Sequence, residues 1–263
     1  METATAPWWI WPVALFAVTF AIGVVAVLAG VGGGVLFVPI VAGFFPFHID
    51  FVRGAGLLLA LCGALSAAPA LLRGGMASLR LAMPLALIGS VTSALGALLG
   101  LALPEGVLYS ALGLIILGMA ALMLGARPGR IPETAMPWRA RHTPAGFAAF
   151  AGIGLLAGVF GIGAGWANVP ALHLLLGAPL KLAVGTSSLL LTVIDTSAAW
   201  VYLNRGAVLP MLAVPSIVGV MLGAKLGVRL LRVAPATTIR RVVILLLIAS
   251  GVRALLKGLG IWS

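Results

Sequence analysis

The sequence predicts an all-α polytopic membrane protein made of two inverted repeats of about five helical segments each. Each repeat is expected to contain a broken helix or hairpin at a glycine-rich motif. Three observations predict this fold class. The chain is 62% hydrophobic and only 8% charged, whereas an average globular domain is about 25% charged. Several apolar stretches reach the roughly 18 residues that cross a hydrocarbon core. A glycine-rich phrase that ends in Val-Pro occurs twice.

The chain repeats itself at an offset of 131 residues, the separation of Gly30 from Gly161. The first glycine phrase, GVGGGVLFVP at 30–39, aligns without a gap with the second, GIGAGWANVP at 161–170. Further pairs at the same offset are Gly54 with Gly185, Gly75 with Gly206, Pro84 with Pro215 and Gly96 with Gly227. We infer an internal duplication: a first transmembrane repeat at 8–125, a basic linker at 126–143 and a second transmembrane repeat at 144–257.

Each repeat predicts the same series of helices: one apolar segment before the phrase, one short segment after it, and three full-length spans. The expected segments are 10–29, 35–47, 54–72, 81–103 and 106–125, and then 145–160, 166–177, 183–203, 208–228 and 240–257. Each short segment, 35–47 or 166–177, reaches only about 20 Å as a helix, less than the roughly 30 Å hydrocarbon core. We therefore expect each phrase inside the membrane, and leave open whether the short helices cross fully or are re-entrant.

Loop charge predicts the orientation. If each repeat makes an odd number of crossings, the repeats are inverted, and only Arg53, Arg205, Arg253 and Lys257 of the 16 Lys and Arg lie opposite the linker. Parallel repeats divide the same charges almost evenly. The positive-inside rule favours the inverted arrangement, with the linker 126–143 cytoplasmic and both termini outside. It also explains the net charge of +11 without a nucleic-acid partner.

The glycine phrases are candidate anion sites. Glycine lets backbone amides approach a ligand closely, and a helix that starts just after the phrase offers unpaired N–H groups and a positive dipole end. Irregular backbone at this depth must in any case line a cavity or be buried in protein. Small residues also bring transmembrane helices together, so close packing is the alternative. The candidate main-chain ligands are Gly32, Gly33, Gly34, Gly163, Ala164 and Gly165.

Polar side chains gather in the second repeat. Asn168 lies in the second phrase, and Thr186, Ser187 and Ser188 begin the next span; we take these four as candidate substrate-binding residues. Asp195 lies about ten residues into that span. An ionisable group at this depth in the membrane is energetically costly, which indicates a functional site. It is the candidate coupling residue, and a hydrogen-bonded Asp that ties helices together is the alternative. Arg53 and Lys181 are expected either to reach lipid headgroups or to gather anions.

These motifs resemble those of the TauE/SafE sulfite exporter family, also called the toluene sulfonate uptake permease family. The resemblance rests on GVGGGVLFVPIV, its echo GIGAGWANVPALHLLLGAPLKLAVGTSS, and then NRGAV, and it covers 12–257. It implies a multi-pass protein of the bacterial inner membrane that transports small sulfur-containing anions such as sulfite, sulfonates or sulfoacetate. Ala164 replaces a usual glycine, and Gly54-Ala55-Gly56 replaces the Thr-Ser of the second repeat.

The leading hypothesis is a secondary transporter that moves a small sulfur oxyanion or organosulfonate by alternating access between two opposed hairpins. A proton or sodium ion is the possible coupling partner. The alternative is a non-transporting membrane scaffold or assembly factor. An enzyme is not expected, because neither a serine–base pair nor an HExxH helix is present. No cofactor or metal is expected, and the lone Cys62 excludes a disulfide framework. The anion, the direction of transport and the oligomeric state stay open.

Overall fold

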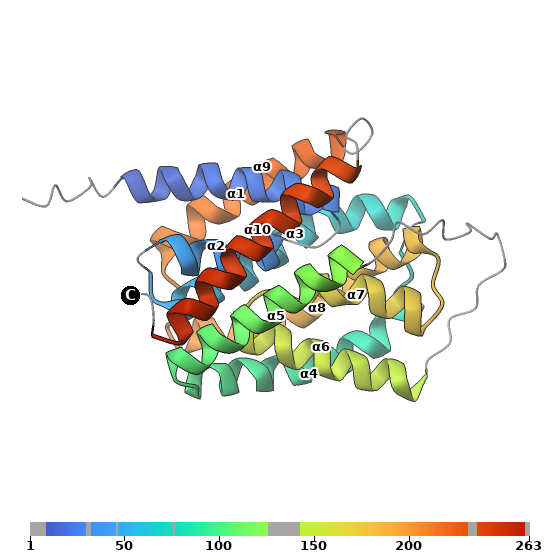
Figure 1. Ribbon diagram of the computed structural model, residues 1–263. Helices are drawn as coiled ribbons and strands as arrows, with labels where there is room; N and C mark the ends of the chain where they lie inside the picture. The colour runs from blue at the N-terminus through green and yellow to red at the C-terminus, as the bar shows by residue number, and fades with distance from the viewer. Residues whose placement is uncertain are drawn as a thin grey trace, which may run out of the picture.

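The computed structural model describes residues 9–29, 33–45, 47–75, 77–125, 143–230 and 236–260. Every regular element in this part of the chain is helical (Figure 1). The helices are α1 (Ile10–Ala29), α2 (Gly33–Phe44), α3 (Ile49–Arg73), α4 (Leu79–Ala102), α5 (Glu105–Gly125), α6 (Pro144–Phe160), α7 (Gly165–Pro170), the π-helical turn η1 (Ala171–Leu175), α8 (Leu180–Asn204), α9 (Pro210–Leu230) and α10 (Ala236–Gly258).

The all-helical prediction is confirmed, and most predicted bounds lie within a few residues of those observed. The largest difference is at α3, which begins at Ile49 rather than at 54 and takes Asp50 into its first turn, where a carboxylate favours the positive end of the helix dipole. The short helix of the second repeat changes type at Pro170. Proline has no N–H to donate, and the chain continues as a wider π-helical turn.

The helix bounds recur at the offset seen in the sequence. Adding 131 to the bounds of α3 (49–73) gives those of α8 (180–204), and adding it to the starts of α4 and α5 (79 and 105) gives those of α9 and α10 (210 and 236). The helices of the pair α3 and α8 run antiparallel. A Cβ on Gly54, near the start of α3, would meet the carbonyl oxygen of Ala207, just after α8. Beyond the other end of α3, Ser78 N donates to Thr186 Oγ1 at 3.1 Å.

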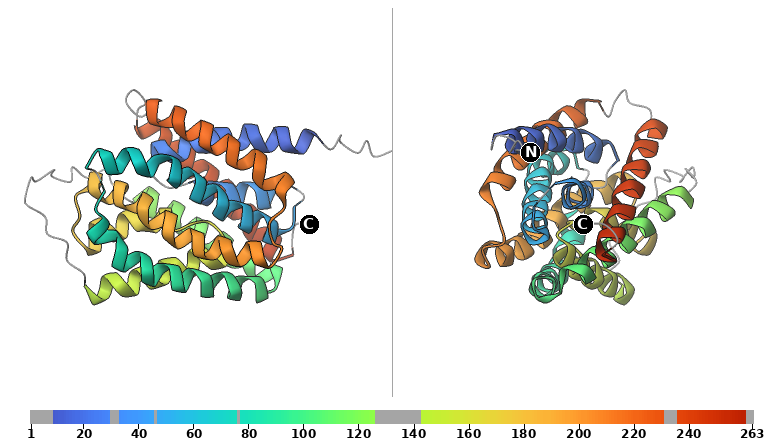
Figure 2. Two further views of the ribbon diagram at one scale, coloured as in Figure 1. Left: turned by 180° about the vertical axis from the view of Figure 1, so that it is seen from behind. Right: turned by 60° about the vertical axis from the view of Figure 1, so that its left-hand side comes forward.

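The pair α5 and α10 is antiparallel as well. A Cβ on Gly106 would lie 3.5 Å from the carbonyl oxygen of Gly258, and one on Gly113 would lie 2.7 Å from the backbone nitrogen of Leu255. The first helix of each half packs on the fourth helix of the other half. Figures 1 and 2 show α1 beside α9 on one side of the molecule and α4 with α6 on the opposite side. The short helix α2 is almost wholly buried and packs on α3 and α10 (Figure 2).

Glycines set the close approach of these outer pairs. A Cβ on Gly23 of α1 would lie 2.6 Å from Val220 O of α9, and Gly154 and Gly158 of α6 pack directly on the backbone of α4. These are the small residues four apart that bring transmembrane helices together. Glycine therefore permits close helix packing at these contacts.

Three described helices carry apolar windows long enough to cross a membrane: Ile49–Ser66 in α3, Leu79–Ala102 in α4 and Pro210–Gly227 in α9. Shorter apolar stretches lie in α1, α2, α5 and α6. Large apolar side chains are exposed on the outer surface, among them Leu87, Leu114 and Trp200 at 62–67%. An exposed apolar exterior of this kind suits contact with lipid rather than water.

Candidate functional site

The two glycine phrases lie against each other in the core. A Cβ on Gly34 of the first phrase would lie 2.6 Å from Ile162 O of the second phrase and 3.1 Å from Gly56 O of α3. Gly33 is packed by side chains instead, with Leu59 at 2.7 Å from a Cβ placed there. Gly32 lies outside the described residues. Glycine is required at residue 34 because the neighbours are backbone atoms, which no rotamer change can move away.

The second phrase has a backbone that only glycine adopts readily. Helix α6 ends at Gly161, a left-handed cap with φ of 65°, whose N–H donates to Ala157 O at 2.9 Å. Gly163 is also left-handed, with φ of 74°. Ala164 then precedes the first turn of α7. The two positive φ values turn the chain between α6 and α7 and leave the backbone around Gly163 open to close approach.

That approach is made by the Asp195 carboxylate. Ala164 N donates a hydrogen bond to Asp195 Oδ1 at 3.1 Å, from the second phrase to the middle of α8. A Cβ on Gly163 would lie 2.9 Å from Asp195 Oδ2. Asp195 is 0% exposed, and Oδ2 has no hydrogen-bond partner among the described residues. Three of the residues selected from the sequence, Gly163, Ala164 and Asp195, are thus brought together.

The first turn of α7 holds further polar atoms without partners. Asn168 is 0% exposed, and neither its Nδ2 nor its Oδ1 has a hydrogen-bond partner in the described part of the chain. The indole Nε1 of Trp166 is also buried and unpaired there. Asn168 stands one turn after Ala164, to whose carbonyl its own N–H donates. Buried polar groups are nearly always satisfied, and this short segment carries two donors and one acceptor that no described residue pairs.

The hydroxyl residues at the start of α8 lie elsewhere. Thr186 accepts a hydrogen bond from Ser78 N and joins α8 to the turn before α4. Ser187 is buried and Ser188 is partly exposed. Nine residues of continuous helix separate Thr186 from Asp195, which is about 14 Å along the axis. The structure therefore does not bring Thr186 to the carboxylate. Further along α8, Thr192 and Ser197 bond carbonyls of their own helix.

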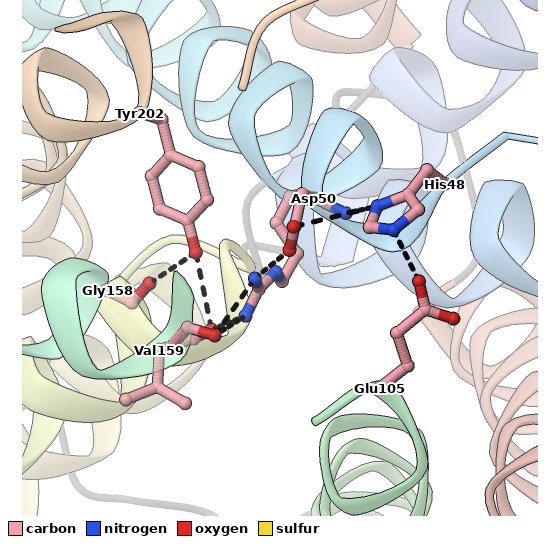
Figure 3. A network of polar contacts seen from close by, with 8 residues as sticks. His48, Asp50, Glu105, Gly158, Val159 and Tyr202 are labelled. Atoms are coloured by element: carbon pink, nitrogen blue, oxygen red, sulfur yellow. Dashed lines mark hydrogen bonds and ion pairs between the residues drawn. The ribbon is translucent and has the colours of Figure 1, made fainter. Parts of the chain in front are cut away.

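Arg53 corrects one expectation from the sequence. It neither reaches lipid headgroups nor stands free to gather anions, because it is 0% exposed. Its NH1 donates to Val159 O at 2.7 Å and to Gly100 O at 3.1 Å, at the carboxyl ends of α6 and α4, and its NH2 pairs with Asp50 Oδ1 (Figure 3). The side chain of Lys181 is outside the described part of the structure.

The polar network around Arg53 extends to both sides. Tyr202 donates its hydroxyl to Gly158 O at 3.1 Å and lies with its ring 5.5 Å from the Arg53 guanidinium carbon. On the other side, Asp50 N donates to His48 Nδ1 at 3.2 Å, and His48 Nε2 pairs with Glu105 (Figure 3). The available sequence signal was the spacing of Asp50 and Arg53, three residues apart on one helix.

Two other polar side chains have structural partners. His173, in η1, contacts Ala178 O through Nδ1 at 2.7 Å, which joins the π-helical turn to the chain just before α8. Within the described residues, no group of three or more His, Cys, Asp or Glu is placed to hold a metal ion. The chemistry available near the glycine phrases is therefore that of main-chain amides, one amide side chain, one indole and one carboxylate.

The comparisons with known proteins agree over nearly the whole chain. A family model described as Sulfite exporter TauE/SafE matches residues 15–254. The chain is 30% identical to the probable membrane transporter protein ORF9 of Sinorhizobium sp., over 92% of this chain and 91% of that protein. It is 32% identical to YunE of Bacillus subtilis over 41% of this chain and 39% of that protein, and 24% identical to YdhB of the same organism over 87% and 94%. Both are named probable membrane transporter proteins. No solved structure matches the chain.

Proposed function

This chain belongs to the sulfite exporter TauE/SafE family, a family of membrane transporters, and from that premise we propose that it moves a small anion by alternating access. The substrate class is a sulfur oxyanion or organosulfonate. The substrate site is the contact region of the two glycine phrases, with Gly33 and Gly34 on one side and Gly163, Ala164, Gly165 and Asn168 on the other. Gly32, Thr186, Ser187 and Ser188 remain candidates from the sequence.

One observation supports an anion at this place more than any other: the Ala164 amide already donates a hydrogen bond to a carboxyl oxygen, that of Asp195, at 3.1 Å. The Gly163 backbone lies so close to the second carboxylate oxygen that a side chain there would touch it. A sulfonate or sulfite has the same kind of oxygen. A phrase that accepts a carboxylate from its own chain has the geometry to accept one oxygen of such a substrate.

The unpaired groups on α7 complete the proposed site. Asn168 Nδ2 and Trp166 Nε1 are buried donors without partners among the described residues. Leaving a buried donor unsatisfied costs about 1–3 kcal/mol, and an oxyanion with three oxygens accepts several such bonds at once. Trp166 was not selected from the sequence, because its first-repeat counterpart Val35 is apolar and an indole in a membrane segment usually suggests an interfacial anchor.

Alternating access follows from the proposed inverted repeats, 8–125 and 144–257. The antiparallel pairs α3 with α8 and α5 with α10 support this arrangement. A pseudo-two-fold axis in the membrane plane would relate the two halves, and the contact between Gly34 and Ile162 O would lie near it. We further propose that the linker 126–143 is cytoplasmic and that both termini lie outside, in a bacterial inner membrane.

Asp195 is the proposed coupling residue. Its carboxylate and the substrate would compete for the same Ala164 amide, so an ionised Asp195 opposes anion binding and a protonated one releases the amide. Described charged or titratable side chains on the elements packed against α8 are Cys62 and Arg53 on α3, with Asp50 and Arg73 at its ends, Arg80 on α4 and His173 on η1. Proton coupling is the version that this geometry supports, and sodium remains the alternative ion.

Transport into proteoliposomes tests the proposal. Purified protein is reconstituted, and uptake of radiolabelled sulfite, taurine and sulfoacetate is measured with and without an imposed proton gradient. The proposal expects saturable uptake of at least one of these three compounds, reduced at least tenfold by Asn168→Ala. Ser197→Ala is the matched control, since Ser197 bonds only its own helix, and it should transport normally. Binding of a partner protein with no anion transport would instead favour the scaffold function.

A further inference from the structure

A cavity of about 400 Å³ opens at one end of the molecule, away from the glycine phrases. Its walls come from the start of α3 and the end of α8: His48, Asp50, Phe51, Arg205, Gly206 and Ala207, with Leu101 of α4. None of these residues belongs to either phrase. The volume suits a small organic anion with some of its water. We call it the outer cavity.

At the outer cavity, one cationic side chain is not paired with a carboxylate of the described residues. The Arg205 side chain is exposed and has no carboxylate partner within the described residues. Glu105 pairs with His48 Nε2, and Nδ1 of the same ring lies 3.6 Å from Asp50 Oδ2. Asp50 is the acidic side chain in the wall, and its charge is matched by Arg53. Among the charged side chains Arg53, Arg205, Asp50 and Glu105, Arg205 is therefore the cation that no described carboxylate pairs.

The Arg53 guanidinium pairs with Asp50 through NH2. The guanidinium is 0% exposed, whereas the Asp50 side chain is 28% exposed. Two backbone carbonyls, Gly100 O and Val159 O, accept from Arg53, and Nε has no partner in the described chain. Asp50 supplies the single negative charge that neutralises this buried cation. Of the two members of this pair, the Asp50 carboxylate is the one that an ion in the cavity can approach, because it is partly exposed.

We propose that the outer cavity is a second anion site, in which a small oxyanion binds Arg205 and exchanges with Asp50 at the Arg53 guanidinium. The ligand class is a monovalent sulfonate or carboxylate. Arg53 also lies next to the second phrase, because a Cβ on Gly161 would lie 2.5 Å from the Arg53 Cα. Arg53 thus connects the outer site to the end of α6, where the second phrase begins. That this site is the first binding site on the transport path rests on the proposed function. That it binds an anion does not.

Methanesulfonate binding to purified protein tests the outer site, measured by calorimetry in detergent. All variants are made in an Asn168→Ala background, which removes a donor of the proposed central site. Arg205→Gln should weaken the remaining affinity at least tenfold. Its control is Arg80→Gln, which removes an exposed arginine beyond the opposite end of α3 and should leave the affinity unchanged.

Asp50→Asn should do the reverse and tighten methanesulfonate binding at least tenfold, because the competing carboxylate is gone and the buried cation is unpaired. Glu105→Gln removes a charge from the same network without contacting Arg53, so it should change the affinity less than twofold. Equal affinities for Arg205→Gln and Arg80→Gln would overturn the proposal. This comparison does not use Asp50→Asn, so it still tests the proposal if that variant does not fold. If the outer site binds methanesulfonate but the protein transports none of the compounds tested, the proposed transport function is wrong and the proposed outer site stands.

Discussion

Ala164 and Asp195 are joined by a hydrogen bond between a backbone N–H and a buried carboxylate, 3.1 Å long, across 31 residues of sequence. The bond connects the irregular backbone of a glycine phrase to the middle of a long helix. It places the one acidic side chain in the described core at the main-chain group that an anionic substrate would need. Substrate binding and the charge of Asp195 are therefore expected to be linked.

Asp195→Asn should uncouple transport from the proton gradient. The amide side chain keeps an oxygen that can accept from Ala164 N, but it carries no charge and takes up no proton. We expect anion binding at neutral pH to be retained or to tighten, while the stimulation of uptake by a proton gradient is lost. Uptake that still responds to the gradient as fully as in the unmodified protein would assign coupling to another group.

Gly163→Ala should destabilise the protein by about 2 kcal/mol, since a left-handed residue with a Cβ costs roughly 1–2 kcal/mol and the new methyl group would crowd Ala60 Cβ and Asp195 Oδ2, each at 2.9 Å. Gly206→Ala is the matched control. Gly206 has almost the same φ, 67°, with no atom within 4 Å of its Cβ position. Its substitution therefore carries only the free-energy cost of the left-handed backbone. Thermal unfolding in detergent compares the two, and equal losses would mean that the contact with Asp195 is unimportant.

Tyr202→Phe should cost about 1 kcal/mol of stability, the usual net value of a hydrogen bond. The variant leaves Gly158 O without the donor that now lies 3.1 Å away, next to the end of α6. The chain's other tyrosine supplies the control: Tyr109 contacts Lys257 through its ring at 4.6 Å, a contact that phenylalanine keeps. Tyr109→Phe should therefore unfold at nearly the native temperature. The prediction fails if the two variants are equally stable.

The inverted topology predicts which turns a membrane-impermeant thiol reagent reaches. Cys62 is the one cysteine, so Cys62→Ala gives a background for single replacements. Leu103→Cys, between α4 and α5, should react from outside intact cells, and Gly74→Cys, after α3, should react only once the cells are opened. Both residues are exposed. Labelling of both from the same side would contradict the orientation.

The helices could be predicted from the sequence because apolar runs of this length have few alternatives in a membrane. The recurrence of glycine and proline at one offset also predicted the short helix after each phrase. Bounds shifted where local capping decided them, as at Ile49, where Asp50 extends α3 by a turn.

The site was only partly predictable. Asp195 and Asn168 were selected because polar groups are rare at such depth, and the structure places Asp195 at the second phrase. The partners of Arg53 were not predictable, because Gly100 and Val159 contribute only carbonyl oxygens, which any residue has. Trp166 Nε1 was missed for a similar reason: whether an indole is paired depends on its tertiary neighbours, not on its spacing.

The most direct test of the central claim is a thermal-shift titration of the purified protein with sulfite, sulfate, thiosulfate, taurine, sulfoacetate and simple carboxylates at pH 5.5 and 7.5. A ligand that binds only the folded state raises the melting temperature with its concentration. The account predicts that one sulfur oxyanion or sulfonate does so, that Asn168→Ala reduces the shift at both pH values, and that Asp195→Asn removes any part of the shift that depends on the charge of Asp195. If no anion stabilises the protein, or if Asn168→Ala responds as the unmodified protein does, the glycine phrases are not an anion site.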